Sequence, residues 1–160
     1  MKILGIDPAL TITGYGAIYA EKNKLRLIEA GVIITSAKQD LTQRLNKIYR
    51  ATLKLISDTK PDILVLEKLY AHHRHPATAY ILGHARGTIC LACAQKNIPL
   101  AEYAATKIKK AIVGQGLAPK QQVQRMVMNM LNLKTVPKYT DVTDALALAI
   151  AHSYIAKTKR

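Results

Sequence analysis

Two acidic residues stand where apolar runs end, a position from which they could support metal-dependent chemistry. Asp7 follows the apolar run at 3–6 and precedes Pro8, and Glu67 follows the run at 63–66. Proline cannot donate to a sheet ladder, so we expect the first strand to stop at Asp7. If the two strands are parallel neighbours, about 4.8 Å apart, both acids emerge at one edge of the sheet. The alternative interpretation of Asp7 is a simple strand-ending turn.

A second acidic pair begins the last apolar run of the sequence. Asp141 and Asp144 are three residues apart, and on a helix this spacing places them on one face, with Cβ atoms roughly 5 to 6 Å apart. The alternative is a helix start, with Thr140 or Asp141 as the N-cap and Asp144 in the first turn. The chain has only 10 acids, and four of them occupy two strand ends and one helix face.

Gathered carboxylates repel one another unless cations neutralise them. Oxygen ligands of this kind suit Mg²⁺ or Mn²⁺. Two such ions, about 3.5 to 4 Å apart, can activate a water molecule and stabilise the leaving oxygen in phosphodiester cleavage. The net charge of +14, from 24 Lys and Arg against 10 Asp and Glu, independently favours a polyanionic partner. We expect no membrane association through a spanning helix, because no apolar run reaches about 20 residues.

The elements that must position these acids follow from periodicity. A chain of 160 residues, 49% of them hydrophobic, suits one core, so we expect a single domain over residues 1–156 and a disordered basic tail at 157–160. The predicted order is three strands, a helix, a strand, a helix, a strand and three helices, which is an α/β arrangement on a mixed sheet. In the helix expected at 39–58, Arg44 falls on a polar face.

Five segments together resemble the bacterial Holliday-junction resolvase RuvC family. They are GIDPALTITGYG at 5–16, ILVLEKLY at 63–70, GHARG at 83–87, AEYAATKIKKAIVGQGLAPKQQVQ at 101–124 and DVTDALALAIAH at 141–152. The resemblance implies an RNase H-like fold, with a five-stranded mixed sheet, antiparallel first three strands and helices on both faces. It also implies a homodimer whose two sites nick a four-way DNA junction symmetrically during recombination and repair, since a two-fold dimer presents equivalent sites to equivalent strands.

The resemblance implies particular residues and partners as well. The implied catalytic and metal-binding acids are Asp7, Glu67, Asp141 and Asp144. The implied DNA contacts are Tyr70, Arg74, Lys109 and Lys120. The implied cofactor is Mg²⁺, with Mn²⁺ as a substitute and two ions per site, and the implied partner besides DNA is a branch-migration helicase. We expect a cytoplasmic location, because the first residues already form a predicted strand and leave no room for a signal segment.

Several features leave alternatives open. Ala9 stands where the family usually has glycine, so the turn after Asp7 would differ if that position needs a positive φ. Residues 72–75, three histidines and an arginine, form either a solvated basic loop or a zinc cluster, although no cysteine or acid accompanies them at ligand spacing. Cys90 and Cys93 are expected to be core residues rather than a redox or metal pair. His84 and Arg86 could either pack near a dimer interface or contact DNA.

Three other functions compete with junction cleavage. An RNase H-like nuclease could act on another substrate, such as RNA in hybrids or flap DNA. The segment at 5–16 is also similar to the phosphate-binding hairpin of actin-like ATPases and sugar kinases, but those proteins need two such domains and this chain has length for one. A catalytically silent junction-binding protein would be compatible with the charge alone.

Overall fold

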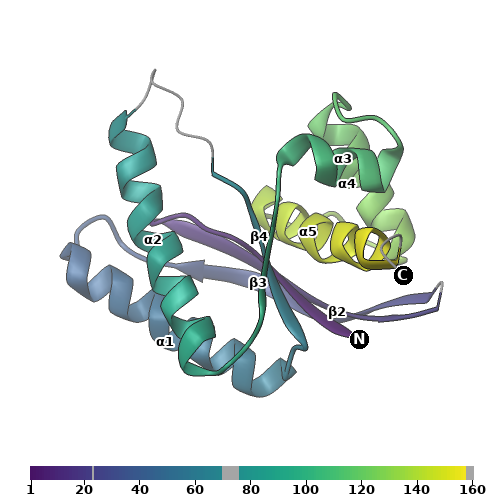
Figure 1. The fold of residues 1–160 in the computed structure, drawn as a ribbon. Coiled ribbons are helices and arrows are strands. Elements are labelled where there is room, and N and C mark those ends of the chain that lie inside the picture. The colour runs from purple at the N-terminus through teal and green to yellow at the C-terminus, as the bar shows by residue number, and fades with distance from the viewer. Residues whose placement is uncertain (23, 70–75, 158–160) are drawn as a thin grey trace.

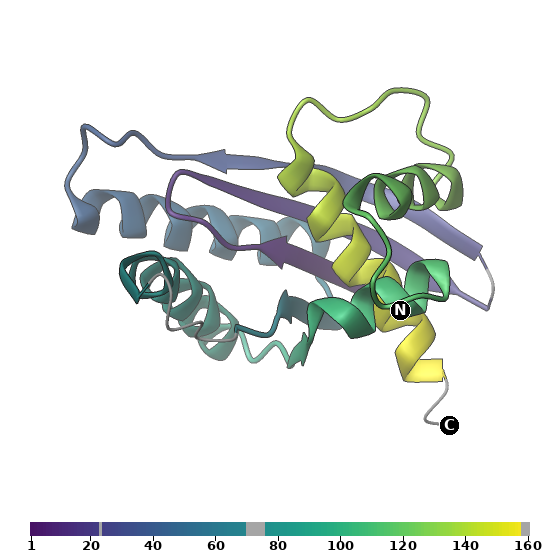
Figure 2. The same ribbon diagram turned by 90° about the horizontal axis from the view of Figure 1, so that it is seen from above.

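A five-stranded mixed sheet separates two layers of helices in the computed structural model, which describes residues 1–22, 24–69 and 76–157 (Figures 1 and 2). The strand order is β3-β2-β1-β4-β5. The first three strands are antiparallel, and β4 and β5 run parallel to β1. The strands are β1 (Lys2–Asp7), β2 (Ile12–Glu21), β3 (Lys24–Ile34), β4 (Ile63–Glu67) and β5 (Leu100–Tyr103). The fold class and the order of elements predicted from the sequence are confirmed.

The helices divide between the two faces of the sheet. They are α1 (Leu41–Thr59), α2 (Pro76–Gln95), α3 (Ala105–Val113), α4 (Lys120–Met130) and α5 (Thr140–Lys157). Figure 1 shows α1 and α2 together on one face and α3, α4 and α5 on the other. The last helix continues through Lys157, one residue into the segment where we expected a tail. Among the described residues, no helix has both the length and the apolar character to cross a membrane.

Strand β1 is apolar on both sides because each side faces a helical layer. Ile3 packs into the core that contains α3, α4 and α5, while Leu4 and Ile6 pack into the core that contains α1 and α2. All three side chains are fully buried. A central strand covered on both faces is expected to be a continuous apolar run, and this run ends at Asp7, where the strand reaches the edge of the sheet.

Helix α5 lies in direct backbone contact with the sheet. A Cβ atom added at Gly5 would lie 2.0 Å from the carbonyl oxygen of Ala145, and one added at Gly14 would lie 2.1 Å from that of Asp141. Alanines on α5 allow the same close approach from the helix side; those buried are Ala145, Ala147, Ala149 and Ala151. Because the helix backbone meets the sheet directly at Gly5 and Gly14, the acids at its start are fixed relative to the end of β1.

Candidate active site

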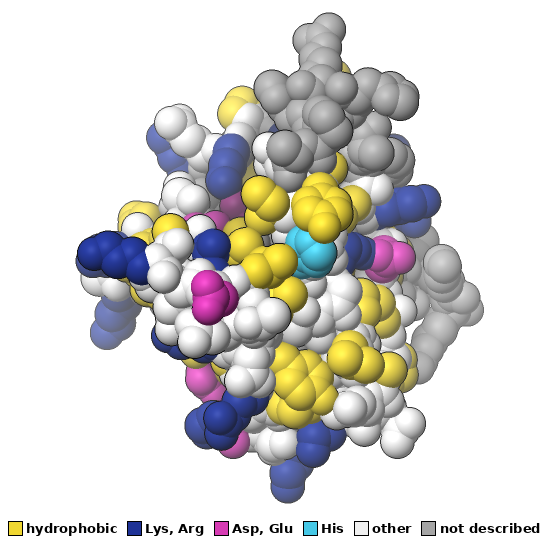
Figure 3. All heavy atoms as spheres, turned by 90° about the vertical axis from the view of Figure 1, so that its left-hand side faces the viewer, with side chains coloured by type: hydrophobic (Ala, Val, Ile, Leu, Met, Phe, Trp, Pro, Cys, Tyr) yellow, Lys and Arg dark blue, Asp and Glu magenta, His cyan; other side chains and the backbone are white. Residues whose placement is uncertain are grey.

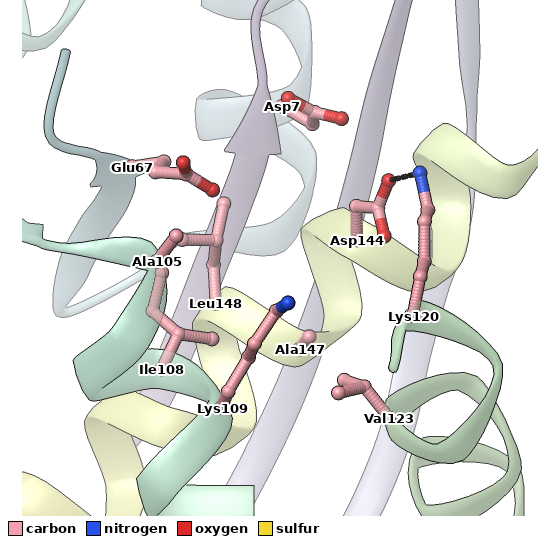
Figure 4. A pocket seen from close by; sticks show the side chains of 10 residues that line it. All are labelled: Asp7, Glu67, Ala105, Ile108, Lys109, Lys120, Val123, Asp144, Ala147 and Leu148. Atoms are coloured by element: carbon pink, nitrogen blue, oxygen red, sulfur yellow. Dashed lines mark ion pairs between the residues drawn. The ribbon is translucent and has the colours of Figure 1, made fainter. Parts of the chain in front are cut away.

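Three of the four predicted acids line one pocket at the carboxyl edge of the parallel strands. Asp7 ends β1, Glu67 ends the neighbouring strand β4, and Asp144 comes from α5. The pocket has a volume of about 190 Å³ and also contains the lysines Lys109 and Lys120 (Figure 4). A crevice outside the carboxyl ends of parallel strands is the usual place for a ligand in an open α/β sheet.

Asp141 lies beside this pocket without lining it. It occupies the first turn of α5, where a negative charge suits the helix dipole. Its backbone rests against Gly14, which is the register partner of Asp7 in the β1–β2 pair. Its charge also contributes to the raised pKa of Asp7. Asp141 therefore combines the structural position we considered for a helix start with electrostatic coupling to the pocket.

The pKa of Asp7 is raised to about 7. Burial is the main cause, followed by the negative charges of Asp144, Asp141 and Glu67, while Lys120 acts in the opposite direction. The pKa of Glu67 is also raised, first by burial and then by Asp144. Negative charges that raise the pKa values of Asp7 and Glu67 make a site that favours a cation or a proton.

We expect the raised pKa of Asp7 to make the metal-free protein less stable as the pH rises. Between the unfolded pKa of 3.8 and the folded pKa of about 7, the folded state binds more protons than the unfolded state, so raising the pH favours unfolding. Asp7→Asn removes this pH-dependent loss of stability, because asparagine does not titrate. In EDTA, its advantage in unfolding free energy over wild type should grow by roughly 2 to 3 kcal/mol between pH 5 and pH 8. Urea titrations at the two pH values measure it, and an unchanged difference would contradict the raised pKa.

Two lysines bring positive charge into the pocket. The Nζ atom of Lys120 lies 2.5 Å from a carboxylate oxygen of Asp144, and this hydrogen bond is the main cause of the raised pKa of Lys120. Figure 4 shows the Lys109 side chain extending toward the middle of the pocket, and its charge opposes the rise in the Glu67 pKa. The family resemblance implies DNA contacts for both lysines, whereas the ion pair of Lys120 with Asp144 is a new observation.

The donor chemistry of this pocket fits a hard divalent cation, because the donors are carboxylate oxygens that repel one another. In their present positions, however, no three acidic, histidine or cysteine side chains of the described residues are close enough together to hold an ion. Asp144 is paired with Lys120 instead. The acids that would hold a cation therefore line one pocket but lie too far apart to hold it as they stand, and Asp144 has Lys120 as its counter-ion.

Arg86 on α2 contacts the end of β4 at Glu67. Its Nη1 atom donates a 2.7 Å hydrogen bond to the backbone oxygen of Glu67, and its guanidinium forms an ion pair with Glu102 on β5. Burial lowers the pKa of Arg86. The sequence allows Arg86 a packing role or a DNA contact, and the structure instead connects α2 through it to the end of β4. Its neighbour His84 packs edge-on against the ring of Tyr80, with centroids 4.5 Å apart.

The turn after Asp7 needs no glycine. Ala9 is not among the residues with a positive φ, so the alanine at this position causes no backbone strain. The hydroxyl of the buried Thr13 donates to the Ala9 carbonyl at 2.5 Å and accepts from the Ala9 amide at 3.2 Å. The departure from the usual family residue therefore leaves the turn in a conformation that alanine adopts readily.

Other sequence predictions fall away from the pocket or beyond the described residues. The predicted DNA contacts Tyr70 and Arg74, with the rest of the histidine-rich loop at 72–75, lie outside the described residues. Cys93 is 2% exposed, and Cys90 is half-buried; both are free thiols, as expected for core residues. His152 is buried and lies 2.8 Å from the hydroxyl of Tyr103 through its Nδ1 atom.

Comparisons with known proteins agree over almost the whole chain. The family model described as crossover junction endodeoxyribonuclease RuvC matches residues 3–152. Relatives with that name from Rhodopirellula baltica and Alkaliphilus metalliredigens are 43% and 44% identical over 154 residues, covering 96% of this chain and 86% and 93% of theirs. The solved structure of T. thermophilus RuvC with a Holliday junction substrate has a TM-score of 0.94 at 30% identity, covering 99% of this chain and 96% of that one.

The sheet order and the acids at its carboxyl edge define a protein of the RNase H-like class. Within that class, the family match and the two relatives are decisive. The chain belongs to the RuvC family of crossover junction endodeoxyribonucleases.

Proposed function

We propose that this protein is a metal-dependent, structure-selective endonuclease that resolves Holliday junctions by symmetric nicking. The observation that carries the proposal is the gathering of Asp7, Glu67 and Asp144 in one lysine-containing pocket at the carboxyl edge of β1 and β4. The family membership supplies the substrate class, since the matching relatives are named crossover junction endodeoxyribonucleases. The net charge of +14 favours a nucleic-acid partner.

In the proposed mechanism, the four acids Asp7, Glu67, Asp141 and Asp144 hold Mg²⁺, with Mn²⁺ as a substitute and two ions per site. The bound ions would lower the pKa of the attacking water and stabilise the leaving oxygen. The chain's own residues bind and orient the scissile phosphate. Lys109 enters the pocket beside Glu67, and Lys120, once its pairing with Asp144 is released, can neutralise a phosphate oxygen. Tyr70 and Arg74 are further proposed DNA contacts.

A homodimer through α2 is part of the proposal. Figure 3 shows hydrophobic side chains gathered around a histidine on the side where α1 and α2 lie in Figure 1. Three exposed apolar residues come from α2, namely Tyr80 (69% exposed), Ile81 (46%) and Leu91 (55%). A Cβ atom at Gly87 would meet nothing within 4 Å, which leaves room for a second helix. An exposed apolar helix face of this kind is typical of a protein interface.

We expect Leu91→Glu to weaken this dimer by at least about 30-fold, because it places a charge on the exposed apolar face of α2. Sedimentation equilibrium at micromolar concentration measures the change. Val136→Glu is the matched control, since Val136 is 61% exposed in the loop between α4 and α5 and away from α2. A Leu91→Glu protein that remains as dimeric as Val136→Glu would exclude α2 as the interface.

A branch-migration helicase partner and a cytoplasmic location complete the proposal. The helicase partner comes from the resemblance to the RuvC family, and the location comes from the sequence, whose first residues are predicted to form a strand and not a signal segment. A pull-down of the helicase with the purified protein tests the first, and fractionation of cells tests the second.

The decisive experiment compares substrates side by side. A synthetic four-way junction, a linear duplex, a flap and an RNA–DNA hybrid are incubated with the protein and Mg²⁺, and cuts are mapped on all strands. We expect paired nicks at symmetric positions of two opposing junction strands and little cleavage elsewhere. Preferential cleavage of the hybrid or the flap would favour an RNase H-like nuclease of another substrate. Junction binding without any Mg²⁺-dependent nick would indicate a catalytically silent junction-binding protein.

A further inference from the structure

An arginine from the neighbouring helix contacts the loop that follows Asp7 at several atoms. Arg44 lies near the start of α1 and reaches across to residues 8–11, which connect β1 to β2. Its Nη2 atom donates to the Leu10 carbonyl at 3.1 Å and to the Thr11 hydroxyl at 3.0 Å. Its Nε atom donates to the Thr35 hydroxyl at 2.9 Å. One guanidinium therefore joins two loops and a helix.

Thr35, at the end of β3, binds the same loop. Arg44 and Thr35 together form what we call the clamp. The Thr35 hydroxyl donates to the same Leu10 carbonyl that Arg44 contacts, and its backbone amide donates to the Thr11 carbonyl at 2.9 Å. Thr35 is 3% exposed and Leu10 is 9% exposed. Hydrogen bonds to a charged group in a partly buried place are among the stronger ones in proteins. The far end of the loop after Asp7 is thus fixed at three atoms.

The clamp affects the position of Asp7 because the loop is short and hydrogen bonds also hold the end of the loop next to Asp7. Thr13 holds Ala9 by both its amide and its carbonyl, so only Pro8 separates Asp7 from a fixed residue. Asp7 pairs in register with Gly14, and Gly14 rests against the backbone of Asp141. A displacement of the loop would therefore change the direction of Asp7 and its spacing from the first turn of α5.

We propose that Arg44 is a positioning residue for the acidic site, which it serves by holding the loop that aims the Asp7 carboxylate. This inference rests on the proposed nuclease function. Arg44 contacts none of the acids in the structure, so its effect passes through the loop. Helix α1 has its own apolar anchors, Ile48, Leu55 and Ile56, all buried against the sheet. Loss of the Arg44 side chain should therefore leave the helix docked and the fold intact.

The test is Arg44→Ala, with Arg50→Ala as the matched control on the exposed face of the same helix. We expect single-turnover nicking by Arg44→Ala to fall about 10- to 100-fold, since a misplacement of about 1 Å can cost that much, while junction affinity changes less than threefold. Arg50→Ala should nick like wild type. Arg44→Lys should recover only part of the loss, because an ammonium group lacks the planar fork that reaches three acceptors.

Two readouts separate a positioning role from a general loss of structure. Guanidinium ion added at millimolar concentration should partly restore nicking by Arg44→Ala and should leave Asp7→Asn inactive. Thr35→Val removes the other side-chain donor to the Leu10 carbonyl, so the Arg44→Ala/Thr35→Val double variant should nick more slowly than Arg44→Ala alone. Wild-type nicking by Arg44→Ala, or a loss that parallels a fall in melting temperature or in junction affinity, would overturn the inference.

Mn²⁺ binding distinguishes failure of this inference from failure of the proposed function. Calorimetric titration of the DNA-free protein should show an affinity about tenfold weaker in Arg44→Ala than in wild type or Arg50→Ala. If wild type binds Mn²⁺ but does not nick junctions, the proposed function fails while the effect of Arg44 on the site can still be measured. Equal Mn²⁺ affinity in Arg44→Ala and wild type would reject the positioning role even if the protein is a junction nuclease.

Discussion

Replacing Asp7 with asparagine is expected to lower junction nicking by more than about 10³-fold, which corresponds to roughly 4 kcal/mol of transition-state stabilisation. Asp7 lies closest to the other acids in electrostatic terms, since the charges of Asp144, Asp141 and Glu67 all raise its pKa. Asparagine keeps the shape of the side chain but removes its negative charge and one of the carboxylate oxygens that would bind a metal ion. The loss should therefore appear in the chemical step, measured under single-turnover conditions with Mg²⁺.

Junction binding should survive this substitution, because binding depends on the positive charge of the chain rather than on its acids. Asp40→Asn is the matched control, since Asp40 is exposed at the start of α1 and its side chain makes no capping hydrogen bond. Full nicking by Asp7→Asn would reject the assignment of the acidic site, and joint loss of binding and nicking would indicate a disrupted surface instead.

Gly5→Ala is expected to destabilise the fold by more than about 3 kcal/mol. The added Cβ atom would lie 2.0 Å from the Ala145 carbonyl oxygen and 3.0 Å from the Ala149 amide nitrogen. Both are backbone atoms of α5 and cannot rotate away, so the whole helix must move off the sheet. That movement would also separate Asp144 from the end of β1, and we expect nicking to be lost even where the variant remains folded.

Gly83→Ala is the control for this substitution. Gly83 is an exposed residue of α2, and a Cβ atom there would meet nothing within 4 Å. Alanine in place of glycine inside a helix should stabilise the protein by about 0.5 to 1 kcal/mol. Urea unfolding of the two variants gives the comparison. A Gly5→Ala protein within 1 kcal/mol of wild type would mean that α5 is held less closely than the structure indicates.

The acids at the strand ends could be predicted from the sequence, because strands covered on both faces leave a visible apolar run that stops at Asp7 and Glu67. The spacing of Asp141 and Asp144 predicts a shared helix face but leaves a plain helix start open, and the structure places only Asp144 in the pocket. The order of the elements followed from the alternation of apolar runs and helical periodicity. These signals are local, so they need no knowledge of how distant segments meet.

The contacts that adjust the site could not be predicted, because each joins segments that are remote along the chain. The pairing of Lys120 with Asp144 depends on how α4 docks beside α5. Arg44 has the spacing of an ordinary residue on a polar helix face, and only the structure shows its guanidinium on the loop after Asp7. Arg86 is similar: nothing near it in the sequence indicates that it meets the backbone of Glu67.

The docking of α5 on the sheet has a consequence for the time at which activity arises during synthesis. Strands β1 and β4, with Asp7 and Glu67, precede α5 along the chain and can pair before it exists. Domains tend to fold from the N-terminus as they leave the ribosome. Until Asp144 has left the ribosome and α5 has packed against Gly5, the growing polypeptide has only part of the acidic site. A newly made chain therefore acquires its full set of acids only after α5 has docked on the sheet.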